Sequence, residues 1–209
     1  AQEGAGYYQL TTRNGLRCST AKAYLSDAKR RSNLHIETDA QATGLVLRVK
    51  RVVGVNYLQN GEKKTAMAGG EVILSAGAIQ SPQLLQLSGI GPRALLEGLG
   101  VPVAHDLPGG GENLQDHRQI RLSFECTKPI TTNDQLNTLF GQAKLGLEWL
   151  IHRSGPLAVG INQGGCFMHA LRDEHGKPVT ETPDIQFHVS TLSADMAGGK
   201  VHPYSGFTM

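Results

Sequence analysis

The sequence has few cysteines and no long apolar run. Its three cysteines lie far apart, form no Cys-x-x-Cys pair and are odd in number: Cys18, Cys126 and Cys166. Such thiols indicate a reduced, cytoplasmic protein rather than a disulfide framework. No stretch approaches the roughly 20 apolar residues of a membrane span, so the sequence predicts no membrane-spanning helix.

The sequence also lacks an excess of charge and a metal-ligand pattern. Its formal net charge is +2, which gives no electrostatic argument for nucleic acid or an anionic membrane. None of its eight histidines falls in a His-x-His or His-x-x-Glu-His arrangement, so no metal site is predicted. The first residues show no basic-then-apolar signal pattern.

Residues 71–91 are the most informative stretch. The apolar run 72–74 has the length of a buried strand, which we extend to residue 76. Four small residues, 75–78, follow and allow a sharp turn or a close approach by another molecule. Ser81 can cap a helix that begins at Pro82. Residues alone leave two readings open, ordinary α/β packing at a tight crossover or a cofactor site at the helix start.

Before this stretch, the sequence alternates short strands with one helix. Asn14-Gly15 and Asn60-Gly61 are typical hairpin turns. A helix is expected from Ser19 or Thr20 into the basic run that ends at Arg31, whose cations suit a helix C-terminus. The expected strands are 7–12, 33–38, 44–50, 52–58 and 63–68. We expect the last three to form a β-meander, inserted between two strands of a larger sheet.

After this stretch, a short helix is expected at 93–99, and strands at 119–126, 164–170 and 184–190. A longer helix, capped by Asn133 or Asp134, carries apolar residues at the spacing of a helix packed on a core. That stripe comprises Leu136, Leu139, Phe140, Ala143, Leu147, Leu150 and Ile151. The helix ends before Gly155-Pro156.

The loop 109–117 reads Gly-Gly-Gly-Glu-Asn-Leu-Gln-Asp-His and has three interpretations. As a phosphate cradle it fails the dinucleotide pattern, because Leu114 stands where the third glycine belongs. As a catalytic pair, Asp116 and His117 are sequence neighbours whose side chains normally diverge. Composition alone favours a flexible linker.

Several strings resemble one family. Residues 77–91, GAIQSPQLLQLSGIG, resemble the second signature of the glucose–methanol–choline (GMC) oxidoreductases, which are FAD-dependent alcohol oxidases and dehydrogenases. The strings Arg-Cys-Ser at 17–19 and Ala-Tyr-Leu at 23–25, the segment 33–42, and Leu-Pro-Gly-Gly-Gly-Glu-Asn-Leu-Gln-Asp-His at 107–117 are also similar to elements of that family. Gly110 stands where the family usually has Val. The resemblance extends from Gly4 to about Ser190.

The resemblance implies an α+β fold in two parts. Residues 1–115 would be a partial α/β FAD-binding domain with a β-meander, and residues 116–209 a partial substrate-binding domain with an antiparallel sheet and helices. It implies FAD as cofactor, with Ala42 contacting the adenine through its backbone and Ala76, Gly77 and Asn113 near the cofactor. Ala42 is equally well an ordinary strand-end turn residue.

The implied reaction is oxidation of a primary alcohol or choline to the aldehyde, with hydride transfer to the flavin. The dinucleotide fingerprint and the catalytic His of the family are both absent, so we expect an internal fragment with no catalytic residue of its own. Alone it would be inactive and bind FAD weakly or not at all. Choline-oxidising members carry Glu where Gln163 stands, which favours a non-cationic alcohol, unless Gln163 is an exposed loop amide.

Two other functions stay open. The chain could be a non-enzymatic α+β binding module that shares only the strand–turn–helix element. It could also be the substrate domain of a flavoprotein with a nicotinamide partner. The expected partner is a small-molecule alcohol, with no nucleic acid, and homo-oligomer formation is left open.

Overall fold

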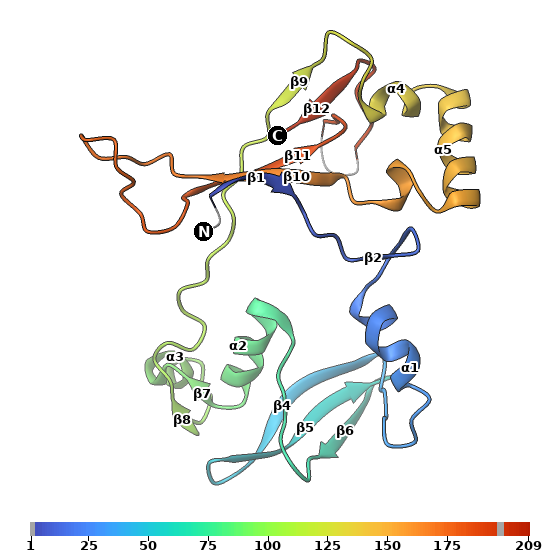
Figure 1. Ribbon diagram of the computed structural model, residues 1–209. Coiled ribbons are helices and arrows are strands. Elements are labelled where there is room, and N and C mark those ends of the chain that lie inside the picture. Colours follow the sequence, from blue (N-terminus) through green and yellow to red (C-terminus); the bar gives the residue numbers. More distant parts are fainter. Residues whose placement is uncertain (1–2, 196–198) are drawn as a thin grey trace. The chain divides into compact units, whose positions relative to one another are not determined.

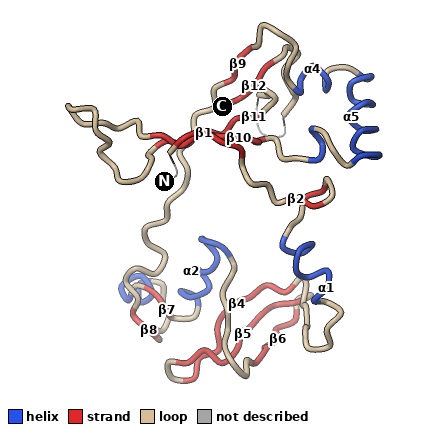
Figure 2. The backbone as a smooth tube through the Cα atoms, in the orientation of Figure 1, coloured by secondary structure: helices blue, strands red, loops and turns tan. Residues whose placement is uncertain are grey.

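The computed structural model describes residues 3–195 and 199–209 and consists of two units. One unit combines the residues up to Arg31 with Gln119–Met209, and the other is Ser32–Arg118. Figures 1 and 2 show helices and mostly antiparallel sheets in both. The predicted α+β class is confirmed, and each unit is described by itself.

A five-stranded antiparallel sheet forms the framework of the first unit. Its order is β1 (Gly4–Tyr7), β10 (Asn162–Met168), β11 (Ile185–Ser190), β12 (Gly206–Thr208) and β9 (Ser123–Glu125). The predicted strands 164–170 and 184–190 correspond to β10 and β11, which pair with Cys166 opposite Phe187. A bulge between Asn162 and Gly164 shifts the register at the start of β10.

Tyr8 follows β1 and lies across the same sheet. Its hydroxyl donates to the Phe187 carbonyl at 2.8 Å and accepts from Gln186 Nε2 at 3.2 Å. A Cβ at Gly165 would overlap this hydroxyl. Residue 165 must therefore be glycine for Tyr8 to keep its place.

The N-terminal hairpin of this unit, β2 (Thr12–Arg13) and β3 (Leu16–Arg17), turns at Asn14-Gly15 as predicted. Trp149 Nε1 donates to the Gly15 carbonyl at 2.7 Å, and the Arg153 guanidinium lies 4.0 Å from the Trp149 ring centroid. The helix expected next is present as η1 (Ala21–Leu25), a π-helical turn, and α1 (Ser26–Ala28). The predicted strand 7–12 is wrong except at its two ends.

The predicted helix 133–151 is two helices, α4 (Thr132–Leu136) and α5 (Leu139–His152). Thr131 and Asp134 form a capping box at the start of α4. The helix is interrupted at Thr138. The backbone of this residue is extended, and its hydroxyl accepts from the Gly141 N–H at 3.0 Å as the cap of α5. A short 3₁₀ turn, η2 (Pro156–Ala158), follows.

The prediction that the apolar stripe of this helix packs on the core is wrong. Phe140 and Leu147 are 82% and 57% exposed, whereas Gly141 and Leu145 on the other side of α5 are buried. Helix periodicity identifies an apolar face but does not say which neighbour covers it.

A three-stranded meander forms the sheet of the second unit, as predicted. It consists of β4 (Ala40–Arg48), β5 (Arg51–Gln59) and β6 (Glu62–Met67), all antiparallel. Asn60 and Gly61 form the β5–β6 turn with φ values of 52° and 83°, the backbone that this dipeptide accepts readily. The strand order β4-β5-β6 has no further strand at either edge among the described residues, so the expected larger sheet is not formed.

Helix α2 (Gly77–Leu87) packs against β4 in the second unit. Ser88 joins them, since its hydroxyl accepts from the Leu45 N–H at 2.8 Å and donates to the Leu84 carbonyl at 2.6 Å. The predicted helix 93–99 is present as α3 (Arg93–Gly98), whose Leu96 is fully buried. Two short parallel strands, β7 (Ile90–Gly91) and β8 (His105–Asp106), lie beside it.

Two strand predictions in the second unit are wrong. Residues 72–76 and 33–38 are outside any strand. Both runs are strand-like in sequence, but no described strand pairs with either of them, and a strand requires hydrogen bonds from a neighbour. Similarly, the predicted strand 119–126 is reduced to Ser123–Glu125, where β12 pairs with it.

The predicted helix start at Ser81 and Pro82 is also wrong. Helix α2 begins at Gly77 and contains Pro82. The Ser81 hydroxyl does cap the chain, but it accepts from the Ala76 N–H at 3.0 Å, one residue before the helix. Pro82 is the sixth residue of α2, in its second turn, so the Ala78 carbonyl loses the hydrogen bond that an N–H at this position would donate.

Within the described residues, no helix is long and apolar enough to cross a membrane. Those residues also contain no group of three or more His, Cys, Asp or Glu side chains that could hold a metal ion.

Candidate functional site

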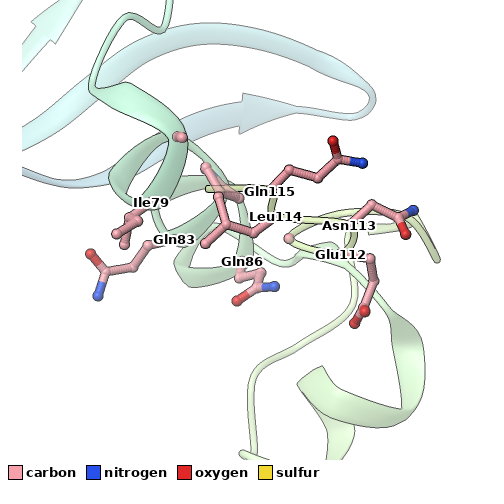
Figure 3. Close-up of a pocket in the computed structure, with 10 residues that line it drawn as sticks. Ile79, Gln83, Gln86, Glu112, Asn113, Leu114 and Gln115 are labelled. Atoms are coloured by element: carbon pink, nitrogen blue, oxygen red, sulfur yellow. The ribbon is translucent and has the colours of Figure 1, made fainter. Parts of the chain in front are cut away.

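A groove of about 630 Å³ lies in the second unit, between the first turns of α2 and the segment 111–115. Figure 3 shows Ile79, Gln83 and Gln86 on the α2 side, opposite the labelled residues of the segment. The groove is lined by Ala78, Ile79, Pro82, Gln83, Gln86, Gly111, Glu112, Asn113, Leu114 and Gln115. Most of these side chains are apolar or neutral amides.

Gln86 holds the segment against the helix. Its Nε2 donates to the Gly110 carbonyl at 2.9 Å. A Cβ at Gly111, where φ is +92°, would stand 2.8 Å from the same nitrogen. Two residues after Gly111, Asn113 has a left-handed backbone conformation, with φ of 55°. Gln86 was not predicted as a site residue, although two amides one turn apart on a short helix, Gln83 and Gln86, indicate a polar helix face.

The start of α2 lies open beside this groove. Gly77 has φ of +92°, and no atom of residues 3–195 or 199–209 lies within 4 Å of the position that a Cβ would take there. The first N–H groups of a helix have no partner within the helix, and they attract anionic groups such as phosphates. Open space, exposed backbone and a positive φ together fit a molecule that approaches the backbone closely.

The structure brings three of the four predicted cofactor residues to this region. Ala76 and Gly77 immediately precede the groove residue Ala78, and Asn113 lines the groove. Ala42 lies instead on β4, paired with Tyr57 and next to a bulge in the strand. The binding roles of all four residues stay predictions.

The fifth predicted residue, Gln163, lies on β10 in the first unit. Its backbone carbonyl accepts from the Tyr8 N–H at 2.9 Å. It lines a second pocket, of about 340 Å³, together with Pro129, Ile130, Thr131, Thr132, Asp134, Gln135, Pro156 and Thr191. Gln163 is thus a half-buried pocket residue rather than an exposed loop amide. Its role as a substrate contact stays a prediction.

Asp134 is the ionisable group of this second pocket. Burial raises the pKa of its carboxyl, but hydrogen bonds from the Thr131 N–H, the Ser205 hydroxyl and the Thr131 hydroxyl together lower that pKa below its ordinary value. The N–H of Thr131 donates to Oδ2 at 2.8 Å and the Ser205 hydroxyl at 2.9 Å. The carboxylate therefore carries its negative charge at neutral pH.

Gln135 contributes a buried acceptor to the wall of the same pocket. Its Oε1 has no hydrogen-bond partner among the described residues, and an unpaired buried oxygen costs free energy. From the sequence, Asp134 was predicted only as a possible helix cap, and Gln135 was not predicted to have a role; in the structure Thr131 is the cap residue and Asp134 completes the capping box. The pocket combines apolar residues with threonines, glutamines and one carboxylate, so it is partly polar and carries one negative charge.

Asp116 and His117 do not form a catalytic pair. The Asp116 carboxylate accepts from the backbone N–H of His117 at 2.7 Å, an interaction of local chain geometry that leaves the imidazole without an orienting group from its neighbour.

The fold and the groove together indicate a class of protein. An α+β chain with a helix start opening onto a roomy groove has the features of a cofactor-binding domain. Residues 1–119 match the family model described as GMC oxidoreductase. Because this match covers more than half of the 209 residues, the chain belongs to the GMC oxidoreductase family. The resemblance found in the sequence is confirmed, together with the FAD-dependent oxidoreductase class that it implies for the family.

The chain is similar over nearly its whole length to proteins named oxygen-dependent choline dehydrogenase. It is 44% identical to the one from Pseudomonas fluorescens over 209 residues and 42% identical to the one from Pectobacterium carotovorum over 207 residues. Each match covers 99% of this chain and 36% of the relative. The chain therefore spans about a third of the length of these relatives.

Solved structures resemble the chain as well. A fungal aryl-alcohol oxidase is 27% identical with a TM-score of 0.71, covering 79% of this chain and 29% of the other. An FAD-dependent oxidoreductase from Chaetomium thermophilum is 29% identical with a TM-score of 0.67, covering 75% and 28%. A formate oxidase has a TM-score of 0.83 at 21% identity, covering 100% and 39%, and this likeness concerns the fold alone.

Proposed function

We propose that the chain is part of an FAD-dependent oxidoreductase that oxidises a CH–OH group. The observation that carries this proposal is the open start of α2 beside the groove, in a chain that belongs to the GMC family. When bound, FAD supplies the group that accepts the hydride from the alcohol. The residues of this chain would hold the cofactor and orient the alcohol.

The groove fits part of a dinucleotide. Gly77 lets a ligand approach the backbone without meeting a side chain, and the first N–H groups of α2 favour a negatively charged group. Asn113 would face the same ligand from the opposite wall. Ala42, on β4, would contact the cofactor through its backbone, because its methyl group offers no polar contact.

For the alcohol, we propose the pocket around Gln163. A pocket lined in part by three threonines, two glutamines and one carboxylate, Asp134, suits the polar hydroxyl of an alcohol and disfavours an anion. The relatives named for choline make choline the first alcohol to test. The neutral amide of Gln163 makes a non-cationic primary alcohol the second.

The test uses a polypeptide that contains this chain and has the full length of its relatives. Mixed anaerobically with choline or a neutral primary alcohol, its flavin absorbance near 450 nm should bleach, and NADH should leave it unchanged. Bleaching by NADH without any response to alcohols would overturn the proposal and favour a nicotinamide-linked flavoprotein.

We further propose that the 209-residue chain alone is inactive and binds FAD weakly, and that the protein is cytoplasmic. The groove is lined by one short helix and one loop segment, a small fraction of the surface that holds a large cofactor. The three free cysteines support a reducing compartment. A purified chain that carries one flavin per polypeptide would contradict the first statement.

A further inference from the structure

One side-chain hydrogen bond joins the two walls of the groove in the second unit. Gln86 Nε2, on α2, donates to the Gly110 carbonyl at 2.9 Å, across 24 residues of sequence. In the part of the chain that the structure describes, no other hydrogen bond links α2 to residues 107–118. The hydrogen bonding between helix and segment therefore depends on this one amide.

We propose that Gln86 is a positioning residue for the cofactor: it keeps the segment 111–115 against α2, so that Asn113 faces the ligand from the wall opposite the helix. This role rests on the proposed function, because the ligand is the FAD of that proposal. Gln86 acts on the ligand through Asn113 and takes no part in the chemistry.

Gln86 lies in a narrow space beside two backbone segments. A Cβ at Gly91 would stand 3.0 Å from Gln86 Cγ, and a Cβ at Gly111 would stand 2.8 Å from Gln86 Nε2. The backbone of both segments thus approaches the half-buried side chain closely, which leaves it few rotamers. A side chain restricted in this way loses little further entropy when it forms its hydrogen bond.

The segment that carries Asn113 has few other constraints. A local turn precedes Asn113, closed by the Glu112 N–H on the Gly109 carbonyl at 3.2 Å. Among the described residues, 113–118 make no backbone–backbone hydrogen bond. Asn113 also has φ of 55°, a conformation that a non-glycine residue keeps only where its surroundings select it. The Gln86 hydrogen bond is therefore the last one before Asn113 that ties the segment to another element.

The bond to Gly110 requires a donor at position 86. A carbonyl oxygen can only accept, so its partner must present an N–H or O–H. Methionine is unbranched like glutamine, has a similar length and has no such donor. Gln86→Met therefore frees the segment without adding charge. The apparent dissociation constant for FAD then rises in proportion as fewer molecules hold Asn113 in its bound position.

The test measures FAD affinity by titrating the FAD-free form of a polypeptide that contains this chain and has the full length of its relatives. Gln86→Met should raise the dissociation constant for FAD by about tenfold, which corresponds to a tenfold smaller competent fraction. Gln80→Met is the matched control, since Gln80 is exposed on the same helix and outside the groove lining, and it should bind FAD as the wild type does.

The wild type separates the two levels of the proposal. Wild-type protein that binds no FAD would overturn the proposed function and the role of Gln86 together. FAD binding that Gln86→Met leaves unchanged, or that both variants weaken equally, would overturn the role of Gln86 alone.

A double variant separates positioning through Asn113 from a general loss of stability. Asn113→Gly removes the side chain without strain, because glycine accepts a φ of 55°, and it should raise the dissociation constant by about tenfold on its own. Adding Gln86→Met to Asn113→Gly should cost less than about a further threefold, since the side chain that Gln86 positions is already gone. A further loss as large as in the wild-type background would show that Gln86 acts independently of Asn113 and would overturn the proposal.

Hydrogen exchange of the FAD-free polypeptide checks the segment without any ligand. In Gln86→Met, the amides of residues 107–118 should exchange several-fold faster than in the wild type, because the segment has lost its hydrogen bond to α2. The Leu96 amide of α3, bonded to the Pro92 carbonyl at 3.0 Å, should keep its rate. Unchanged exchange over 107–118 would overturn the proposal. Equally faster exchange at Leu96 would show a general loss of structure and overturn it as well.

Discussion

The meander and the segment 72–75 have similar sequences and different structures. In β5, Val55 pairs with Leu45 of β4 and Ala66 of β6, and Val52 pairs with Leu47 of β4. Residues 72–74 are Val-Ile-Leu, yet they pair with no described strand, and Ile73 is 77% exposed. The difference shows that an apolar, β-branched run becomes a strand only where neighbouring backbone is present to bond it.

Among the variants that test this comparison, Gly54→Val should lower the free energy of unfolding the most. A Cβ at Gly54 would stand 2.6 Å from the Ala66 carbonyl oxygen on the paired strand β6. Because the contact is with backbone, the strands must separate, and we expect a loss of about 2–3 kcal/mol in the free energy of unfolding. Gly44→Val on β4 is the matched control, since its Cβ would meet only the Ser88 hydroxyl at 3.8 Å. Urea denaturation with equal losses in both variants would contradict the pairing described.

Ser88→Ala tests how the meander is attached to α2. The substitution removes the hydroxyl that bonds both the Leu45 N–H and the Leu84 carbonyl. We expect a loss of about 1–2 kcal/mol, because Leu45 is buried and its N–H would be left unpaired. Thermal unfolding measures the effect, and hydrogen exchange of the Leu45 amide locates it. Unchanged protection of that amide would show that another group replaces Ser88.

Asp184→Asn tests the first unit. Asp184 lies at the end of the long connection that joins β10 to β11. The Ala170 N–H and then the Leu171 N–H lower the pKa of Asp184 by donating to its carboxylate, at 2.7 and 2.9 Å. A lowered pKa in the folded state means that the carboxylate contributes stability above its unfolded pKa, near 3.8. That contribution is lost as the pH falls through the lower folded value.

The wild type should therefore be more stable than Asp184→Asn by a constant margin from pH 7 to about 5. The margin should shrink at more acid pH, below 3.8. Denaturation curves of both proteins at several pH values measure it. A margin that grows as the pH falls would reverse the sign and contradict the assignment.

Ile73→Ser should have the smallest effect. Since Ile73 is largely exposed and unpaired, we expect a change within about 0.5 kcal/mol in the 209-residue chain. The same change at Val55, in the middle of the meander, is the comparison and should cost clearly more. If Ile73→Ser destabilises the chain as much as Val55→Ser, residues 72–75 are paired after all.

Sequence predicted the parts of the fold that depend on near neighbours. The meander follows from alternating runs and the Asn60-Gly61 turn, and α3, β10 and β11 from periodicity and their punctuating residues. Residues 33–38 and 72–76 were wrong because their pairing depends on distant segments. The break at Thr138 was missed because two consecutive caps lie inside one continuous apolar pattern.

The cofactor site could be predicted only from the resemblance of residues 77–91 to the GMC signature. Small residues before a helix predict a close approach of some molecule at Ala76 and Gly77, and nothing in their spacing names FAD. The position of Asn113 in the groove depends on the Gln86–Gly110 hydrogen bond, which joins residues 24 apart in sequence. The pocket around Gln163 depends on α4 and β10, which no local pattern connects.

The FAD content of two glycine variants tests the central claim most directly, in a polypeptide that contains this chain and has the full length of its relatives. Gly77 and Gly61 both have positive φ and open space at the Cβ position, so Ala strains the backbone in a similar way at each. Only Gly77 adjoins the groove. We expect Gly77→Ala to lower the bound FAD per chain by about tenfold or more at limiting FAD, and Gly61→Ala to leave it unchanged. Equal FAD content in the two variants would contradict a cofactor cradle at the start of α2.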